Sequence, residues 1–324
     1  MTPDRLAAAR DFLARQGEGD VVLDSLPADA SFRCYHRLRG RGLLLMDAPP
    51  EKETVTPCIE GATILHGYGL GAPKILAADV GHGFVLLEDF GEATFTRLLA
   101  ADPVQEADLY ALALETLAAL HEASKDQALS VPPYDVATLA REANLVVEWP
   151  KPLVFDVQQE YAALWLPLLE ELAAYWPKVL VLRDFHVDNL MLRSGVDGHQ
   201  GRCGLLDFQD ALAGHPAYDV VSLLQDVRRE VSPVVVEKGL EGWLARYPQA
   251  ERAALRRAYH LLGAQRALKI VGIFHRLNIR DRKPRYQAFL PRTWRLVGEN
   301  MAVEPSLAVL GGFLKAHFPE GIPS

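Results

Sequence analysis

Leu182-Arg183-Asp184-Phe185-His186-Val187-Asp188-Asn189-Leu190-Met191-Leu192 is the stretch of this 324-residue chain that decides its fold. The apolar runs on its two sides, 179–182 and 190–192, predict two short strands. A polar segment joins them. A polar loop between two strands is how many folds present side chains at the edge of a cleft. Asp184 and Asn189, five positions apart, are therefore the first candidates for chemistry.

A second segment, Gly204-Leu205-Leu206-Asp207-Phe208-Gln209-Asp210, repeats the arrangement, because an apolar strand again ends in a carboxylate. The Gly-rich stretch 194–201 before it predicts a hairpin turn. A hairpin returns the chain to its starting point, so Asp207 is expected close to Asn189. A carboxylate and an amide oxygen are ligands that Mg²⁺ prefers. The two residues therefore predict a magnesium site, completed by triphosphate oxygens and waters.

The order and spacing of these groups are typical of kinases. A catalytic loop with the pattern D-x-x-x-x-N is followed there by a strand that delivers a second Asp. In this interpretation Asp184 is the catalytic base, Asn189 and Asp207 hold Mg²⁺, and ATP is the co-substrate. Each motif alone is weak, since an Asp after an apolar strand is often only a turn or a helix cap. The complete series of strands, loop and turn favours the catalytic interpretation.

The rest of the chain predicts an α+β fold of the two-lobed protein-kinase-like type. Residues 1–90 read as a small β-rich N-terminal lobe that binds nucleotide, with strands expected at 32–38, 42–46 and 83–89 and helices at 4–16 and 56–69. Residues 91–324 read as a larger, mostly helical C-terminal lobe for catalysis and substrate binding. Its expected helices include 102–124, where Asp102-Pro103 is a good helix start, and 156–175.

Composition excludes several other classes of protein. The net charge is −8 and no run of five basic residues occurs, so nucleic acid is not expected as a partner. No apolar stretch approaches the roughly 18 residues that span a bilayer. The three cysteines are scattered, which favours free thiols in a reducing compartment. We therefore expect a cytoplasmic protein with no membrane partner and no evident obligate protein partner.

The two acidic segments resemble the aminoglycoside phosphotransferase and choline kinase superfamily. Its catalytic loop usually reads H-G-D-x-H-x-x-N. His186 matches, whereas Leu182-Arg183 replaces the leading His-Gly. The family pattern I-D-W/F-x-D-A…G-x-P-x-Y-D-L resembles residues 206–220. The resemblance implies the two-lobed kinase fold, ATP and Mg²⁺. It also implies a structural role for Asp219, which buttresses the catalytic loop in the family, although Asp219 as a helix N-cap is an alternative.

Further segments narrow the resemblance to one branch of that superfamily. They are residues 29–37, 46–53, 207–211 and 265–286, and the match covers nearly the whole chain. Members of this branch phosphorylate the anomeric hydroxyl of N-acetylmuramate and/or N-acetylglucosamine during peptidoglycan recycling. The resemblance therefore implies a small-molecule sugar substrate. Candidate substrate-binding residues are His186, Asp188, Asp210, Arg266, Lys269 and Arg276, of which the basic ones would meet the lactyl carboxylate of N-acetylmuramate.

The nucleotide side departs from the usual kinase pattern. The strand that normally carries a phosphate-binding Lys reads Leu43-Leu44-Leu45-Met46-Asp47, so Arg33, Arg37 or Lys52 is expected to supply that charge. Glu60 is the candidate for the helix Glu that pairs with this Lys in kinases, and it lacks an obvious partner. No G-x-G-x-x-G occurs, so residues 28–32 would bend over the phosphates. The expected nucleotide-binding residues are Ser31, Phe32, Arg33, Leu87, Glu88 and Asp89, with the last three at the hinge that meets adenine.

Other functions remain open at this point. The acceptor of the phosphoryl group could be an aminoglycoside, choline or another sugar, although the basic late segment argues against a cationic acceptor. The missing Lys and the missing Gly-rich loop would also suit a non-catalytic, pseudokinase-like binding module. For single residues, His186 could be only a packing residue of the loop. The basic residues after 265 could form only a solvated helix face.

Overall fold

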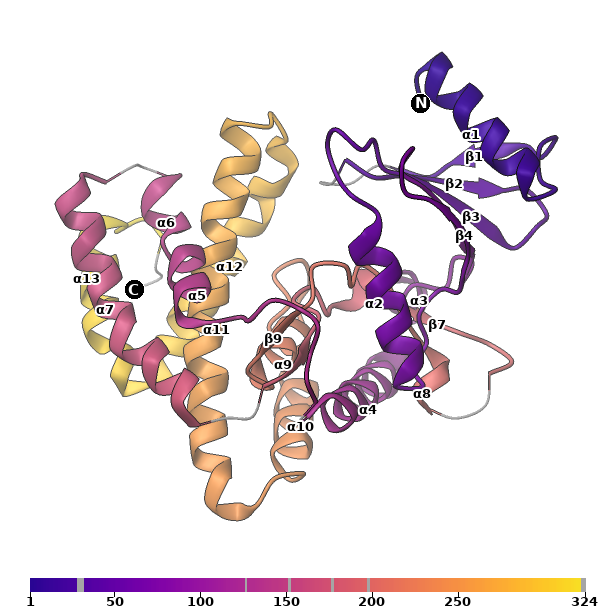
Figure 1. The fold of residues 1–324 in the computed structure, drawn as a ribbon. Coiled ribbons are helices and arrows are strands. Elements are labelled where there is room, and N and C mark those ends of the chain that lie inside the picture. The colour runs from indigo at the N-terminus through magenta and orange to yellow at the C-terminus, as the bar shows by residue number, and fades with distance from the viewer. Residues whose placement is uncertain (28–31, 126, 151–152, 176–177, 197–198, 322–324) are drawn as a thin grey trace. The chain divides into compact units, whose positions relative to one another are not determined.

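A computed structural model describes residues 1–27, 32–125, 127–150, 153–175, 178–196 and 199–321 (Figure 1). The chain forms two compact units. The first contains Met1–Gln105 and Val187–Asp210, and the second contains Glu106–His186 and Ala211–Ser324. The first unit therefore includes the segment after the Asp184 loop as well as the N-terminal part. The fold class expected from the sequence, a small antiparallel β-rich part and a helical majority, is confirmed. The division at residue 90 stays a prediction.

A five-stranded antiparallel sheet forms the centre of the first unit, with the strand order β1-β2-β3-β5-β4. Its strands are β1 (Leu23–Ser25), β2 (Cys34–Leu38), β3 (Leu43–Asp47), β4 (Ile75–Asp79) and β5 (Phe84–Glu88). Gly40 and Gly42 have positive φ between β2 and β3, a conformation that glycine adopts without strain. This turn lets the apolar run of β3 pair with β2 on one side and with β5 on the other.

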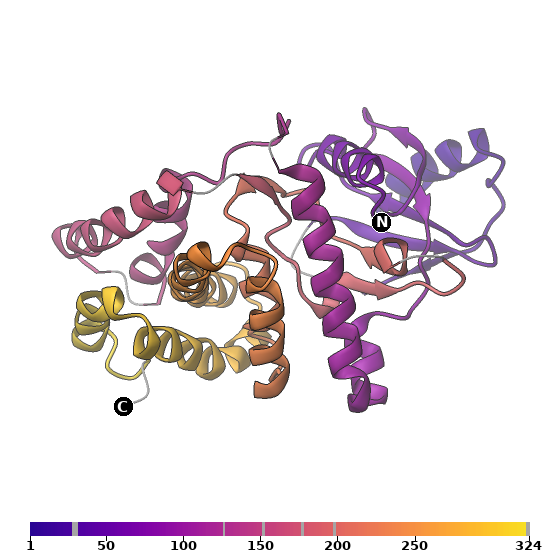
Figure 2. The same cartoon turned by 90° about the horizontal axis from the view of Figure 1, so that it is seen from below.

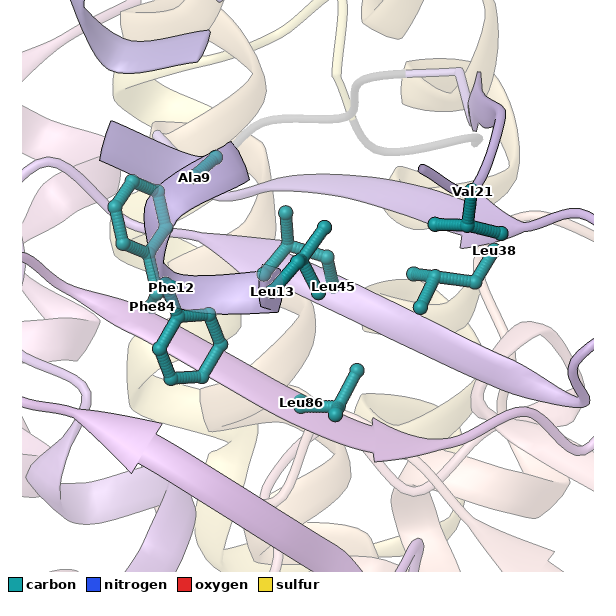
Figure 3. Packing of buried hydrophobic residues seen from close by; sticks show 8 residues of the cluster. All are labelled: Ala9, Phe12, Leu13, Val21, Leu38, Leu45, Phe84 and Leu86. Atoms are coloured by element: carbon teal, nitrogen blue, oxygen red, sulfur yellow. The ribbon is translucent and has the colours of Figure 1, made fainter. Parts of the chain in front are cut away.

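The helix α1 (Pro3–Arg15) packs on this sheet and builds a small core (Figure 3). Thr2 caps its first turn and a proline follows at the start, which is a favourable helix beginning. Phe12 of α1 stacks on Phe84 of β5, with ring centroids 5.9 Å apart. The cluster consists of buried apolar residues from α1, from the segment before β1 and from the sheet, which are Ala9, Phe12, Leu13, Val21, Leu38, Leu45, Phe84 and Leu86.

A hairpin of β7 (Leu190–Leu192) and β8 (Cys203–Leu205) belongs to the first unit, and the 3₁₀ turn η2 (Val187–Asn189) precedes it. Leu190 pairs with Leu205, and the amide of Leu206 donates to the carbonyl oxygen of Asn189 over 2.9 Å. The first unit also holds α2 (Thr56–Gly67), α3 (Phe95–Ala101), η1 (Pro103–Gln105) and α8 (His199–Arg202). The hairpin predicted for 194–201 is thus present, with α8 on its returning side.

Helices make up most of the second unit, and several of them gather around the 31-residue helix α11 (Gln249–Ile279; Figures 1 and 2). Those that pack on α11 include α5 (Val136–Ala143), α6 (Leu145–Glu148), α9 (Ala217–Leu224) and α12 (Leu290–Val303). The remaining elements are α4 (Glu106–Ser124), α7 (Phe155–Tyr175), α10 (Pro233–Leu244), α13 (Ala308–His317), the paired strands β6 (Val179–Val181) and β9 (Leu212–Gly214), and the 3₁₀ turns η3 (Pro284–Phe289) and η4 (Pro305–Leu307). Among the described residues, no helix is both long and apolar enough to cross a membrane.

Candidate active site

Asp219 holds the backbone of the loop that carries Asp184. Its carboxylate accepts hydrogen bonds from the amide of Leu182 over 2.6 Å and from the amide of Arg183 over 2.8 Å. Asp219 lies in the first turn of α9 and is completely buried, and burial raises its pKa to about 7. The N-cap of α9 is Pro216, so Asp219 bonds to the catalytic loop and does not cap the helix. The contact expected of this residue is therefore present.

The side chain of Asp184 is exposed to solvent at the end of this loop. Desolvation by the surrounding protein acts to raise the pKa of its carboxyl group, but nearby positive charge outweighs that effect and the pKa is lowered. The groups that lower it are, in order of effect, His186, Lys269, Arg266 and Arg228. At neutral pH Asp184 is therefore ionised, which is the form that can accept a proton.

His186 is buried two residues further along the loop. Its Nε2 lies 3.0 Å from a guanidinium nitrogen of Arg228, which donates a hydrogen bond to it. Burial lowers the pKa of His186 to about 3, so the ring is neutral at neutral pH. The positive charge near Asp184 at that pH consequently comes from Lys269, Arg266 and Arg228.

Asp207 lies at the base of the β7–β8 hairpin together with Asn189, as the spacing predicts. The Nδ2 of Asn189 is 3.5 Å from Oδ2 of Asp207, and the Nε2 of Gln209 donates to Oδ1 over 2.8 Å. Asp207 has a φ of 58°, a left-handed backbone that is uncommon for any residue but glycine. Strained backbone conformations cluster at functional sites, although Asp adopts this one more readily than most residues. The hairpin thus brings together the two residues expected to hold a metal ion.

Arg33 supplies a positive charge to Asp207. Its side chain is buried at the start of β2, with one guanidinium nitrogen 3.2 Å from Oδ1 of Asp207 and another 3.1 Å from Glu53. Arg37, by contrast, is bound to Asp89 and lies 2.9 Å from Glu92. Of the basic residues considered for the missing strand Lys, Arg33 is therefore the one that contacts a candidate metal ligand.

The side-chain oxygen atoms of Asn189 and Asp207 suit a magnesium ion. Asn189 and Asp207 offer the oxygen ligands that Mg²⁺ prefers, and the guanidinium of Arg33 shows that positive charge is already favoured beside Asp207. In the described part of the chain, no three His, Cys, Asp or Glu side chains gather as a metal-binding set. A cation bound here would thus take most of its ligands from water or from a phosphate-bearing molecule.

The other expected nucleotide-binding residues differ in what surrounds them. Ser31 lies outside the described residues. Phe32 is 62 % exposed, with the ammonium of Lys52 5.6 Å from its ring centroid. Leu87 is buried, and the amides of Glu88 and Asp89 donate over 2.9 Å to the carbonyl oxygens of residues 74 and 42. The expected hinge is therefore an ordered end of β5 whose amides already have acceptors.

The basic residues of α11 expected at the substrate are buried to different degrees. Arg266 is 4 % exposed and Lys269 is 9 % exposed, so the solvated-face alternative is wrong for both. The ammonium of Lys269 lies 2.9 Å from Glu142 and 3.3 Å from the hydroxyl of Tyr218. The charge of Arg266 acts to lower the pKa of both Asp184 and Asp219. Arg276 is half-buried at the far end of the helix.

The acidic candidates for substrate binding lie in the first unit. Asp188 accepts a hydrogen bond from the hydroxyl of Thr96, and Asp210 is exposed. The sequence analysis did not identify Glu53, Glu142, Tyr134 or Arg228. No local pattern marks them, because each is important only through a partner far away in the chain. The signal in the sequence was Arg183, because a cation directly before the candidate catalytic Asp indicates an acidic partner elsewhere in the chain.

Comparison with known proteins places the chain in a family. The model of the family described as "Phosphotransferase enzyme family" matches residues 23–259, which include both acidic loops. The chain therefore belongs to the phosphotransferase enzyme family.

Two curated relatives and one solved structure extend this finding. The chain is 37% identical to an N-acetylmuramate/N-acetylglucosamine kinase of Caulobacter vibrioides, with 98% of each chain covered. It is also 37% identical to the N-acetylmuramate/N-acetylglucosamine kinase of Pseudomonas aeruginosa, over 96% of this chain and 94% of that one. An ADP-bound aminoglycoside phosphotransferase has the same fold, with a TM-score of 0.61 and 14% identity, over 92% of this chain and 99% of that one.

Proposed function

We propose that this protein is an ATP- and magnesium-dependent kinase that phosphorylates the anomeric hydroxyl of N-acetylmuramate and/or N-acetylglucosamine. The observation that carries the proposal is the 37% identity to kinases of this name over nearly the whole length of both chains. The Asp184 loop and the Asn189–Asp207 pair add the chemical groups that such a reaction needs. The product would be a sugar 1-phosphate, and we infer a role in the recycling of cell-wall amino sugars in the cytoplasm.

Asp184 is the proposed catalytic base. Its carboxylate is exposed, and its lowered pKa keeps it ionised at neutral pH, so it can orient and accept the proton of the anomeric hydroxyl. His186 is buried and bonded to Arg228, which suits a supporting role near the acceptor better than proton transfer. Asp219 keeps the loop backbone in place and takes no part in the chemistry.

Asn189 and Asp207 are the proposed magnesium ligands. When bound there, Mg²⁺ supplies neutralisation of the phosphate charge that develops during transfer. Arg33 is the proposed substitute for the strand Lys, because its guanidinium has the planar donor fork that suits phosphate and because Glu53 holds it beside Asp207. Ser31 and Phe32 are proposed at the phosphates and Leu87, Glu88 and Asp89 at the adenine.

The acceptor site is proposed to contain Arg266, with Arg276, Asp188 and Asp210 as further candidates. Arg266 is buried, and its charge lowers the pKa of Asp184, the proposed base. A buried cation is costly unless anions compensate its charge, and an anion on the acceptor would add to the compensation that Asp184 and Asp219 give. The carboxylate of N-acetylmuramate is such an anion. Choline and aminoglycosides are cations, so the positive charge around the catalytic loop disfavours them as acceptors.

Product identification tests the proposal. The protein is incubated with MgATP and with each of four acceptors, namely N-acetylmuramate, N-acetylglucosamine, choline and an aminoglycoside, and the products are followed by phosphorus NMR. We expect a sugar 1-phosphate from one or both amino sugars. Phosphorylation of choline or of the aminoglycoside alone would contradict the proposed acceptor. ATP binding without any phosphorylated product would support a binding module in place of an enzyme.

A further inference from the structure

Arg183, the residue directly before Asp184, has an unusual backbone. Its φ is 71°, in the left-handed region that disfavours every residue with a side chain except where the surroundings hold it there. Glycine, which has no side chain, adopts this conformation freely. A sequence that places arginine here therefore needs contacts that stabilise it.

Those contacts come from the backbone and the side chain together. The amide of Arg183 donates to Asp219, and its carbonyl oxygen accepts a hydrogen bond from the hydroxyl of Ser222 over 3.2 Å. Its guanidinium lies 2.5 Å from Oε1 of Glu142 and 5.6 Å from the ring centroid of Tyr134. The side chain thus extends away from the loop and ends in a buried ion pair on α5.

Glu142 joins this arginine to a second cation. Its Oε2 lies 2.9 Å from the ammonium of Lys269 and accepts a hydrogen bond from the hydroxyl of Tyr134. Glu142 is 8 % exposed. Burial acts to raise the pKa of its carboxyl group, but Lys269 and Arg183 outweigh that effect and the pKa is lowered. One ionised carboxylate therefore connects α5, α11 and the catalytic loop.

We propose that Glu142 and Arg183 are positioning residues that fix the direction of the catalytic base. Together with Tyr134 and Lys269 they form a cluster, called here the Glu142 anchor. The anchor holds the side chain of Arg183, and Asp219 holds the backbone at the same residue, so the bond that leads to Asp184 is restrained from two sides. Lys269 belongs to this anchor, because its ammonium is already bound to Glu142 and Tyr218.

This inference rests on the proposed role of Asp184 as catalytic base, and it differs from a merely structural cluster in what it predicts. A misdirected base slows the chemical step and leaves the binding of both substrates unchanged. A cluster that only stabilises the fold would instead change the melting temperature and leave the turnover of folded protein unchanged. The two roles are therefore separated by kcat, KM and thermal unfolding measured on the same variant.

The informative variant is Arg183→Gly, because glycine removes the side chain and accepts the left-handed backbone. We expect kcat to fall at least tenfold, with both KM values within twofold of the wild type and a nearly unchanged melting temperature. Arg282→Gly is the matched control, since Arg282 is an exposed arginine with a φ of 56°. This control should keep the wild-type kcat.

Glu142→Gln tests the other half of the ion pair and leaves the Arg183 side chain in place. We expect a similar fall in kcat. The double variant Arg183→Gly/Glu142→Gln should be no slower than the slower single variant, since both changes remove the same interaction. If Arg183→Gly does not fold, Glu142→Gln carries the same test with the same criteria.

An Asp184→Asn variant measured in parallel separates the failure of this inference from the failure of the proposed function. If Asp184→Asn keeps wild-type turnover, the proposed catalytic base is wrong, and the inference falls with it. If Asp184→Asn is inactive while folded Arg183→Gly and Glu142→Gln both keep the wild-type kcat, the proposed function stands and the anchor is overturned. Multiplying effects in the double variant would also contradict the shared anchor.

Discussion

The two loops that carry the acidic residues are held in opposite ways. At Asp184 the protein binds the backbone on the N-terminal side, through Asp219, and leaves the carboxylate exposed. At Asp207 the protein binds the carboxylate itself, through Arg33 and Gln209. The contacts described for the first loop are therefore to its backbone, whereas those of the second include the carboxylate, although both acidic side chains reach solvent.

This difference matches the two proposed roles. A catalytic base must already point in the right direction when the substrate arrives, and backbone restraint provides that. A carboxylate that binds magnesium exchanges a protein cation for the metal ion. Before the metal ion binds, an arginine that contacts the carboxylate compensates its negative charge. The contrast is thus between a fixed group and an exchangeable one, and four experiments test it.

The largest effect is expected for Asp184→Asn. General-base catalysis contributes about 100- to 10,000-fold to a rate, so kcat should fall within that range while the Kd of nucleotide changes little. Steady-state kinetics with a calorimetric titration of MgATP would check this. A matched control is Asp24→Asn, which changes a surface carboxylate that pairs with Arg39. An equal loss of activity in the control would remove the special status of Asp184.

A smaller but clear effect is expected on stability for Asp219→Asn. The side-chain amide of asparagine has one acceptor oxygen, whereas the carboxylate of Asp219 accepts from the backbone N–H groups of both Leu182 and Arg183 with two. One of these N–H groups therefore loses its partner in the variant. Such a loss costs about 1–3 kcal/mol. Urea unfolding should show a lower free energy of unfolding, and kcat should fall as well. Unchanged stability and kcat would mean that the loop is not held by Asp219.

Arg33→Met tests whether Asp207 is the exchangeable group. Without the guanidinium, the proposed phosphate contact is lost, and we expect the Kd of ATP to rise about tenfold, equivalent to about 1.4 kcal/mol. Titrations of ATP at several magnesium concentrations give the measurement. Arg39→Met is the control, because Arg39 pairs with Asp24 on the surface of the same unit. Equal ATP affinity in both variants would exclude Arg33 from the nucleotide site.

The smallest effect is the pH dependence of stability that a buried histidine, His121, causes in the second unit. This unit also contains Asp184. Burial lowers the pKa of His121 to about 3. The unfolded chain takes up a proton as the pH falls through about 6.5, but the folded chain does not. The contribution of His121 to the free energy of unfolding is therefore fully present above pH 6.5. It decreases as the pH falls from there toward 3, and at pH 5.5 the loss is roughly 1 kcal/mol.

Urea unfolding of the wild type and of His121→Phe at pH 7.5 and pH 5.5 checks this sign. The variant should lose less stability between the two pH values than the wild type. The ring nitrogens of His121 make no hydrogen bond within the described residues, so phenylalanine removes no hydrogen bond there. An equal loss in both proteins would show that His121 does not titrate as its burial implies.

The sequence predicted the arrangement of Asn189 and Asp207 well, because the information is local. An apolar run, a Gly-rich turn and a second apolar run define a hairpin, and the hairpin determines which residues meet at its base. The same reasoning located α1, β2, β3 and β5. It missed β1 and β4, which are short or only half-buried and have a weak apolar pattern.

The sequence could not identify the residues that hold these loops. Glu142 meets Arg183 across 41 positions, and Arg33 meets Asp207 across 174 positions. No periodicity encodes such pairs, because they depend on the packing of whole elements. The carboxylate that contacts Arg33 is that of Glu53, which precedes α2, whereas the kinase pattern led us to expect the helix Glu at Glu60.

The β7–β8 hairpin also offers a place for a spectroscopic reporter. Asn189 and Asp207 lie at its base, whereas Ser194 is exposed and lies beyond the paired strands. Of the native cysteines, Cys58 and Cys203 are buried and Cys34 is half-buried. A fluorophore attached at Ser194→Cys would therefore label one chosen position preferentially. Its emission would then report what happens at the hairpin during turnover, without an alteration of any group proposed to bind or react.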